Sequence, residues 1–83
     1  MLANDMKKGQ LGTLHNGWNF KIEDNKKGVI RMCTVYGAYT EMGSVYIHDM
    51  NTLTMPDGSV EKIEFSDRQQ KQIDKIKTAL SVF

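Results

Sequence analysis

The chain has 83 residues, of which 40% are hydrophobic and 25% are charged, and its formal net charge is +1. This length allows one small domain, and this composition excludes collagen-like, low-complexity and strongly disordered chains. Eleven lysines and arginines against ten aspartates and glutamates leave no overall basic excess, which a dedicated duplex-DNA binder usually carries.

The cellular compartment is predicted from the cysteine content and from the absence of apolar runs. Cys33 is the sole cysteine, so no disulfide can form within the chain and a reducing interior is favoured. The first ten residues hold two lysines without a following apolar run, so we expect no signal peptide. No segment approaches the roughly 18 apolar residues of a membrane span. We therefore expect a cytoplasmic protein, in the host cytoplasm if the chain is viral, with no membrane contact.

The first hairpin is predicted at Asn16-Gly17, between strands at about residues 10–15 and 18–24. Both turn residues tolerate positive φ, so this dipeptide favours a two-residue type I′ turn. Counting outward from such a turn pairs Thr13 with Phe20. Apolar and polar residues alternate after the turn, which indicates a half-buried strand.

Two further strands are predicted on either side of a loop at residues 37–43. Residues 29–36 are apolar on both faces, which is typical of a central strand. Residues 44–55 are read as one long strand, in which the alternation falters at 49–51 and a bulge or bend is expected.

The last hairpin is predicted at Pro56-Asp57-Gly58. Proline presets φ at the first turn position, and glycine accepts the left-handed position of a bulged three-residue loop. Leu53 then pairs with Glu61, and the final strand covers residues 59–65. This register places four apolar residues on one face of the sheet: Leu53, Met55, Ile63 and Phe65.

A helix is predicted over residues 67–82. Ser66 followed three residues later by Gln69 forms a capping box. The helix then carries an apolar stripe at helical spacing, made of Ile73, Ile76, Leu80 and Phe83.

Together these elements predict an α+β fold: a five-stranded antiparallel meander with one C-terminal helix packed on it. Residues 1–9 are expected to be a flexible N-terminus, and residues 10–83 a single small domain. Local pairing leaves two architectures open, an open sheet and a small SH3-like or OB-like barrel.

Catalytic and metal-binding patterns are weak. His15, Cys33, His48 and Asp49 lack the paired spacing of a metal site, and Cys33 lies in the most apolar strand, where a buried thiol is the simpler interpretation. No phosphate-binding loop or serine-nucleophile motif is present. We therefore expect a protein that is not an enzyme, with no cofactor and no metal.

Protein binding is predicted around residues 37–43. Tyrosine and methionine are enriched at the centres of protein interfaces, and a loop presents them outward. The competing interpretation is that these side chains pack on the second face of the sheet. The predicted partner contacts are Tyr36, Tyr39, Glu41, Met42 and Tyr46.

Binding of single-stranded nucleic acid is the alternative. Residues 1–65 carry a net charge of −1 and residues 66–83 carry +2, and the tyrosines could stack on bases. Tyrosines in a basic groove would favour nucleic acid, whereas tyrosines in a neutral patch would favour protein. A solvated helix face explains the same lysines without any ligand. The candidate nucleic-acid contacts are Lys26, Lys27, Arg31, Arg68, Lys71 and Lys75.

Residues 31–49, with the sequence RMCTVYGAYTEMGSVYIHD, resemble segments of short uncharacterised phage or prophage accessory proteins. The resemblance implies a viral gene product and no particular activity. Because many such proteins bind a host enzyme or a defence complex, as anti-CRISPR inhibitors do, the leading prediction is a small non-enzymatic protein that inhibits or modulates a host protein. The alternative is a small β-barrel module for single-stranded nucleic acid, and a homodimer is compatible with either.

Overall fold

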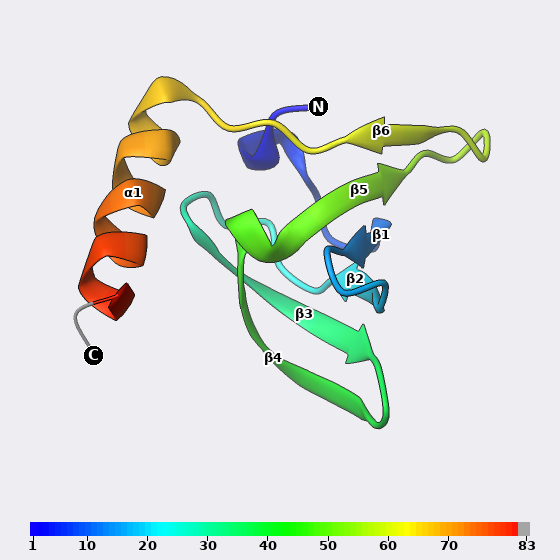
Figure 1. Cartoon of the computed structure of the whole chain (residues 1–83). Helices are drawn as coiled ribbons and strands as arrows, with labels where there is room; N and C mark the ends of the chain where they lie inside the picture. The colour runs from blue at the N-terminus through cyan, green and yellow to red at the C-terminus, as the bar shows by residue number, and fades with distance from the viewer. Residues whose placement is uncertain (82–83) are drawn as a thin grey trace.

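A computed structural model describes residues 1–81 as an antiparallel sheet and one C-terminal α-helix (Figure 1). The prediction of an α+β antiparallel fold is confirmed, although the sheet has six strands where five were expected. The elements in chain order are η1 (Ala3–Asp5), β1 (Leu11–Leu14), β2 (Asn19–Ile22), β3 (Ile30–Tyr36), β4 (Thr40–Tyr46), η2 (Ile47–Asp49), β5 (Met50–Thr54), β6 (Val60–Lys62) and α1 (Asp67–Ser81).

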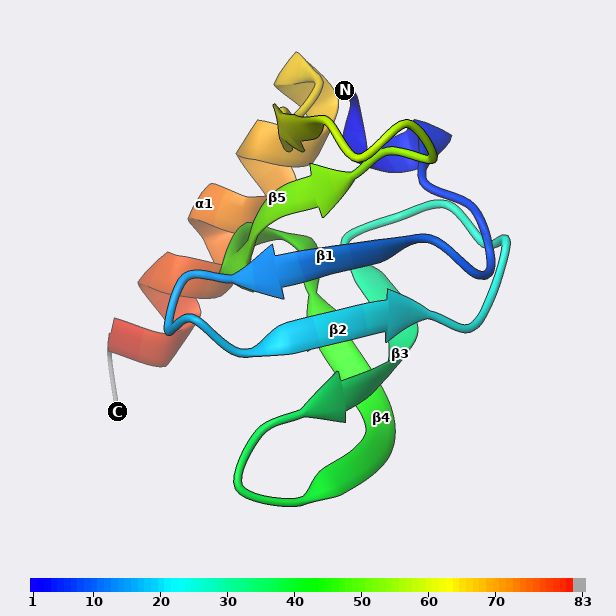
Figure 2. The same cartoon turned by 90° about the vertical axis from the view of Figure 1, so that its right-hand side faces the viewer.

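The strand order is β4-β3-β2-β1-β5-β6, so the chain leaves β4 at one end of the sheet and re-enters it beside β1. In a flat sheet, β4 and β5 would be about 19 Å apart, because neighbouring strands are about 4.8 Å apart. The connection from Tyr46 to Met50 has four Cα–Cα steps and extends to about 14 Å at most, so the sheet has to curl. Figures 1 and 2 show the β3–β4 hairpin bending away from the plane of β1 and β5. The sheet nevertheless stays open, since β4 and β6 have no pairing with each other among the described residues.

The sixth strand arises because the predicted strand at residues 44–55 is two strands. The faltering alternation at 49–51 marks the end of η2, which separates β4 from β5. In addition, the predicted loop at 37–43 is mostly strand, because Gly43 pairs with Cys33 in the β3–β4 ladder. Reading this glycine as a breaker therefore placed the start of the strand four residues too late.

The register of the first hairpin also differs from the expectation. Gly17 has φ +92°, but Asn16 does not have positive φ. The loop therefore has three residues, with the Trp18 carbonyl accepting the Leu14 N–H at 2.7 Å. Phe20 now pairs with Gly12 rather than with Thr13. Its ring occupies the space over Gly12, where an ideal Cβ would lie 2.6 Å from the Phe20 Cζ, so the missing side chain makes room for the aromatic ring.

The second hairpin is confirmed. The Met55 N–H donates to the Ser59 carbonyl at 2.7 Å, Leu53 pairs with Glu61, and Gly58 has φ +87°. Leu53 and Ile63 are buried in the core, as the bulged register requires.

Residues 1–9 belong to the fold, contrary to the expectation that they lack a structural role. Ala3 and Met6 are buried in the core, and the Ala3 N–H donates to the Glu64 carbonyl at 2.8 Å. These residues form no strand or amphipathic helix, so they leave no periodic pattern. Their position depends on contacts with distant parts of the chain.

Helix α1 packs on the sheet through its first half. The capping box is confirmed, with the Gln69 N–H donating to Ser66 Oγ at 3.2 Å and the Ser66 N–H donating to Gln69 Oε1 at 3.3 Å. Ile73 is fully buried, whereas Leu80 is 59% exposed, so the apolar stripe leaves the sheet near the middle of the helix. Phe83 lies outside the described residues. No helix within residues 1–81 is long and apolar enough to cross a membrane.

Candidate functional site

The β3–β4 hairpin has two faces, and the predicted partner residues divide between them. We call the face that carries the core the inner face, and the opposite face the outer face. Directly paired residues share a face, and Val35 pairs with Glu41 whereas Thr34 pairs with Met42. Tyr36, Met42 and Tyr46 therefore lie on the outer face, Glu41 lies on the inner face, and Tyr39 lies in the turn. The five residues do not form one continuous contact surface.

The outer face of the hairpin is apolar and exposed. Met42 is 66% exposed, and the other large apolar side chains of this face are also exposed or half-buried. We call this set the outer patch: Ile30, Met32, Tyr36, Met42 and Tyr46. A patch of this kind on a small protein commonly marks a site of association.

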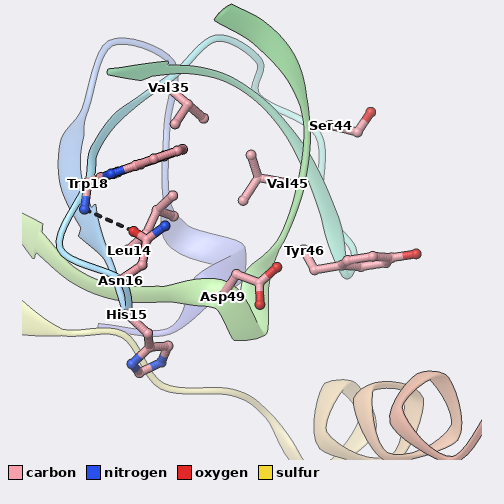
Figure 3. Close-up of a pocket in the computed structure, with 9 residues that line it drawn as sticks. All are labelled: Leu14, His15, Asn16, Trp18, Val35, Ser44, Val45, Tyr46 and Asp49. Carbon is pink, nitrogen blue, oxygen red and sulfur yellow. Dashed lines mark hydrogen bonds between the residues drawn. The ribbon is translucent and has the colours of Figure 1, made fainter. Parts of the chain in front are cut away.

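The inner face of the same hairpin contributes to an open cleft of about 460 Å³ between the β1–β2 turn and β4 (Figure 3). Figure 3 shows Leu14, Trp18, Val35 and Val45 extending into this space, while Asp49 and His15 lie at its rim. We call it the Trp18 cleft. The Asn16 Oδ1 accepts the backbone N–H of Trp18 at 2.9 Å, which orders the turn at one end of the cleft.

Trp18 stands between this cleft and a second, smaller hollow. The smaller hollow has about 80 Å³ and is lined by Trp18, Val35, Ala38, Tyr39 and Glu41. The indole ring lies against Gly37, where a side chain would collide with it, and it remains 46% exposed. The sequence predicted a half-buried strand from about residue 18 to residue 24 and assigned Trp18 no binding role. A tryptophan directly after the Asn16-Gly17 turn was the available sequence signal, whereas its contact with Gly37 depends on the fold.

The histidines and the cysteine do not form a metal or nucleophile site. Within residues 1–81, no group of three histidine, cysteine, aspartate or glutamate side chains is placed to hold a metal ion. The His48 ring stacks on Tyr46 with centroids 5.2 Å apart, and its Nε2 is 3.9 Å from Asp49 Oδ1. Burial raises the pKa of the Cys33 thiol to about 11, so this side chain remains a neutral member of the core at physiological pH.

Arg31, a predicted nucleic-acid contact, is fully buried and is not available to a ligand. Its Nε donates to Asp24 Oδ1 at 2.7 Å, and its Nη2 donates to the carbonyls of Met6 at 2.8 Å and Asp24 at 3.0 Å. Its Nη1 donates to the Ala3 carbonyl at 3.3 Å. The guanidinium thus fastens the N-terminal segment to the sheet. Sequence reasoning missed this role because the partners lie far from Arg31 along the chain.

Asp24 is the charge partner of this buried arginine. Burial raises the pKa of its carboxyl group, but the Met32 N–H, donating to Oδ2 at 2.8 Å, and the Arg31 guanidinium both lower it. The net result is a pKa below the ordinary value of 3.8, so the carboxylate is ionised at neutral pH.

The other predicted cationic contacts are exposed, but they lie far from the turn of the β3–β4 hairpin. Lys27 and Arg68 line a shallow hollow of about 260 Å³ beside the start of α1. Lys71 and Lys75 extend this basic surface along the helix, and Lys26 lies next to Lys27 in the loop. Figures 1 and 2 both show the start of α1 on the opposite side of the molecule from the turn of the β3–β4 hairpin. The hairpin turn, which carries Tyr39, therefore does not share a groove with these cations.

Comparison of the chain with protein-family models, curated proteins and solved structures finds no match.

Proposed function

We propose that this chain is a small non-enzymatic binding protein that inhibits or modulates another protein through the Trp18 cleft and the adjacent turn of the β3–β4 hairpin. The resemblance of residues 31–49 to phage accessory proteins implies a host enzyme or defence complex as the class of partner. The proposal depends on that resemblance for the partner, and on the geometry of the cleft for the mode of binding.

The exposed indole of Trp18 is the observation that carries the proposal. It lies between two hollows and next to Tyr39, which is 78% exposed in the turn. Tryptophan and tyrosine dominate the binding energy of protein interfaces when they lie near the centre and exclude water. An apolar floor with Asp49, His15 and Glu41 at its margins matches the apolar core and polar rim of such interfaces.

The charge of the cleft supports a protein partner over single-stranded nucleic acid. The described residues that line the two hollows include Asp49 and Glu41 but no lysine or arginine. A phosphate backbone gains its affinity mainly from cationic side chains, so this surface offers it repulsion rather than attraction. Tyr39 thus lines a hollow without lysine or arginine among its described lining residues, which supports a protein partner.

The proposal is tested by affinity capture from a lysate of the native host, followed by calorimetric titration of the purified partner. A central aromatic anchor contributes about 2 kcal/mol or more, so Trp18→Ala is expected to raise the dissociation constant at least about 30-fold. Tyr39→Ala should weaken binding as well. Val60→Ala, which truncates an exposed side chain on the distant strand β6, is the matched control and should leave the constant unchanged.

Two outcomes would contradict the proposal. One is a partner whose affinity is insensitive to both aromatic substitutions. The other is binding of a single-stranded oligonucleotide that weakens steeply with salt and is lost when Lys27 and Arg68 are replaced.

A further inference from the structure

Strand β4 is a long, unprotected edge of the sheet. It runs for seven residues from Thr40 to Tyr46 and, within residues 1–81, pairs only with β3. Natural edge strands are usually short, or carry lysine, proline or a bulge that prevents pairing with another chain. β4 contains no lysine and no proline, and its ladder with β3 is continuous from Tyr36–Thr40 to Ile30–Tyr46.

The other edge of the sheet shows the usual protection. β6 has three residues, and two of them, Glu61 and Lys62, are charged and exposed. The chain beyond it is already paired, because Glu64 donates its N–H to the Met1 carbonyl at 2.8 Å and accepts from Ala3. Of the two edge strands, β4 is thus the one that lacks the usual protection against pairing with another chain.

The free hydrogen-bonding groups of β4 belong to its even-numbered residues. The Gly37 N–H donates to the Tyr39 carbonyl and the Ile47 N–H donates to the Val29 carbonyl, so odd-numbered residues form the hydrogen-bonded pairs of the β3–β4 ladder. In an antiparallel ladder the intervening residues direct both backbone groups to the other side. The free edge therefore presents the N–H and C=O groups of Thr40, Met42, Ser44 and Tyr46.

We propose that β4 pairs antiparallel with β4 of a second copy of this chain, about a two-fold axis at Gly43. In this register Met42 lies opposite the partner's Ser44, and Thr40 lies opposite the partner's Tyr46. Each such pair exchanges two backbone hydrogen bonds, which gives about eight across the interface. The two copies form one continuous antiparallel sheet.

The sequence of β4 fits its own copy at this register. Gly43 lies on the axis, where paired backbones approach most closely, and nothing lies within 4 Å of the position a Cβ would take there. The only charged residue of β4 is Glu41, which lies opposite the partner's Val45. The two glutamates are four residues apart along the pair, about 14 Å, which exceeds the screening length of about 8 Å at physiological salt. No like charges therefore oppose each other.

The dimer would also account for the outer patch. The two-fold axis is perpendicular to the sheet, so the outer patches of the two copies become neighbours and Met42 packs across the new ladder. The two Trp18 clefts open on the same side of the sheet, and each is bordered by Ser44 and Tyr46 of the paired strand. Self-association and partner binding therefore use neighbouring surfaces, and the sedimentation experiment measures the first without any partner present.

Sedimentation equilibrium of the purified chain, from about 1 μM to about 500 μM, tests the pairing. The 9.5-kDa chain is expected to approach about 19 kDa as the concentration rises. Ser44→Pro removes an outward N–H without removing a bond to β3, so it should keep the fold and raise the dimer dissociation constant at least tenfold. Ser44→Ala keeps the N–H and is the matched control. Far-ultraviolet circular dichroism verifies that each variant folds.

A charge-exchange experiment tests the register. The double variants M42D/S44D and M42K/S44K each oppose like charges across the axis and should be monomeric. An equimolar mixture opposes Asp and Lys, so it should form a dimer. A wild-type chain that is monomeric throughout the range would refute the proposal, as would a dimer that survives Ser44→Pro or a mixture that fails to associate. None of these outcomes depends on whether the Trp18 cleft binds a partner.

Discussion

The ion pair between Arg31 and Asp24 makes the stability of this chain unusually sensitive to one carboxylate. Asp24→Asn removes the negative charge but leaves the guanidinium fully buried, with its bonds to the carbonyls of Ala3, Met6 and residue 24. Breaking a buried pair in this way costs about 3–5 kcal/mol. Because the Asp24 side chain is 17% exposed and water reaches its outer side, we expect a loss near the lower end, about 3 kcal/mol.

This loss is large compared with the stability of the whole chain. At about 0.05–0.15 kcal/mol per residue, 83 residues give a free energy of unfolding of about 4–12 kcal/mol. Urea denaturation followed by the fluorescence of Trp18 measures the change. Asp57→Asn is the matched control, since it removes a carboxylate from an exposed turn, and its effect should be small.

A double-mutant cycle separates the ion pair from other effects of the substitution. Arg31→Met replaces the cation with an unbranched apolar side chain. The cycle that combines it with Asp24→Asn should give a coupling energy of about 2–3 kcal/mol. If Asp24→Asn costs less than about 1 kcal/mol, the pair behaves as a solvent-exposed one, and the reasoning that treats it as a buried ion pair is refuted.

Three further predictions follow from the same structure. The free energy of unfolding should fall as the pH drops below about 4, because the folded-state pKa of Asp24 lies below its ordinary value of 3.8. Ionised Asp24 stabilises the fold above that value, and this contribution is lost as the pH falls through the folded-state pKa. Urea titrations at pH 2–7 would measure the loss. Cys33 should not react with a disulfide reagent at pH 8 in the folded chain and should react after unfolding, because burial raises its pKa to about 11; rapid labelling of the folded chain would contradict this. Gly12→Ala should lower the free energy of unfolding by about 2 kcal/mol or more, because the added Cβ would lie 2.6 Å from Phe20 Cζ. Gly43→Ala is the comparison, since its Cβ would meet no described atom within 4 Å. It should be close to neutral in thermal melts at low concentration.

Local signals predicted the later part of the chain well. The bulged loop at Pro56-Asp57-Gly58 and the capping box at Ser66 and Gln69 depend on residues within a few positions of each other, and both are confirmed. The helix start follows from the same local chemistry.

The first hairpin and the split of residues 44–55 could not be predicted in the same way. The turn at Asn16-Gly17 has a local preference for two residues, but the packing of Phe20 over Gly12 accompanies a three-residue loop. The position of β5 beside β1 depends on curling of the whole sheet, which no local pattern encodes.

The candidate site was predicted only in part for a related reason. Residues 37–43 were expected to be a loop, but residues 40–43 belong to β4, and the side of each residue depends on the β3–β4 register. The smaller hollow is lined by Tyr39 and Glu41 together with Trp18. The outer patch instead contains Tyr36, Met42 and Tyr46.

The sequence alone determined the antiparallel α+β class, the second hairpin and the capped helix, because short-range backbone preferences and side-chain periodicity decide these features. Only the tertiary structure decided which strands form the edges, that Arg31 is a buried structural cation, and that residues 1–9 complete the core. These features depend on groups that are distant in the chain, such as Ala3 and Arg31, whose burial is favourable only when the fold brings their partners together. The net charge of +1 thus gives no sign of the buried ion pair between Arg31 and Asp24, nor of the aromatic cleft beside the free edge of β4.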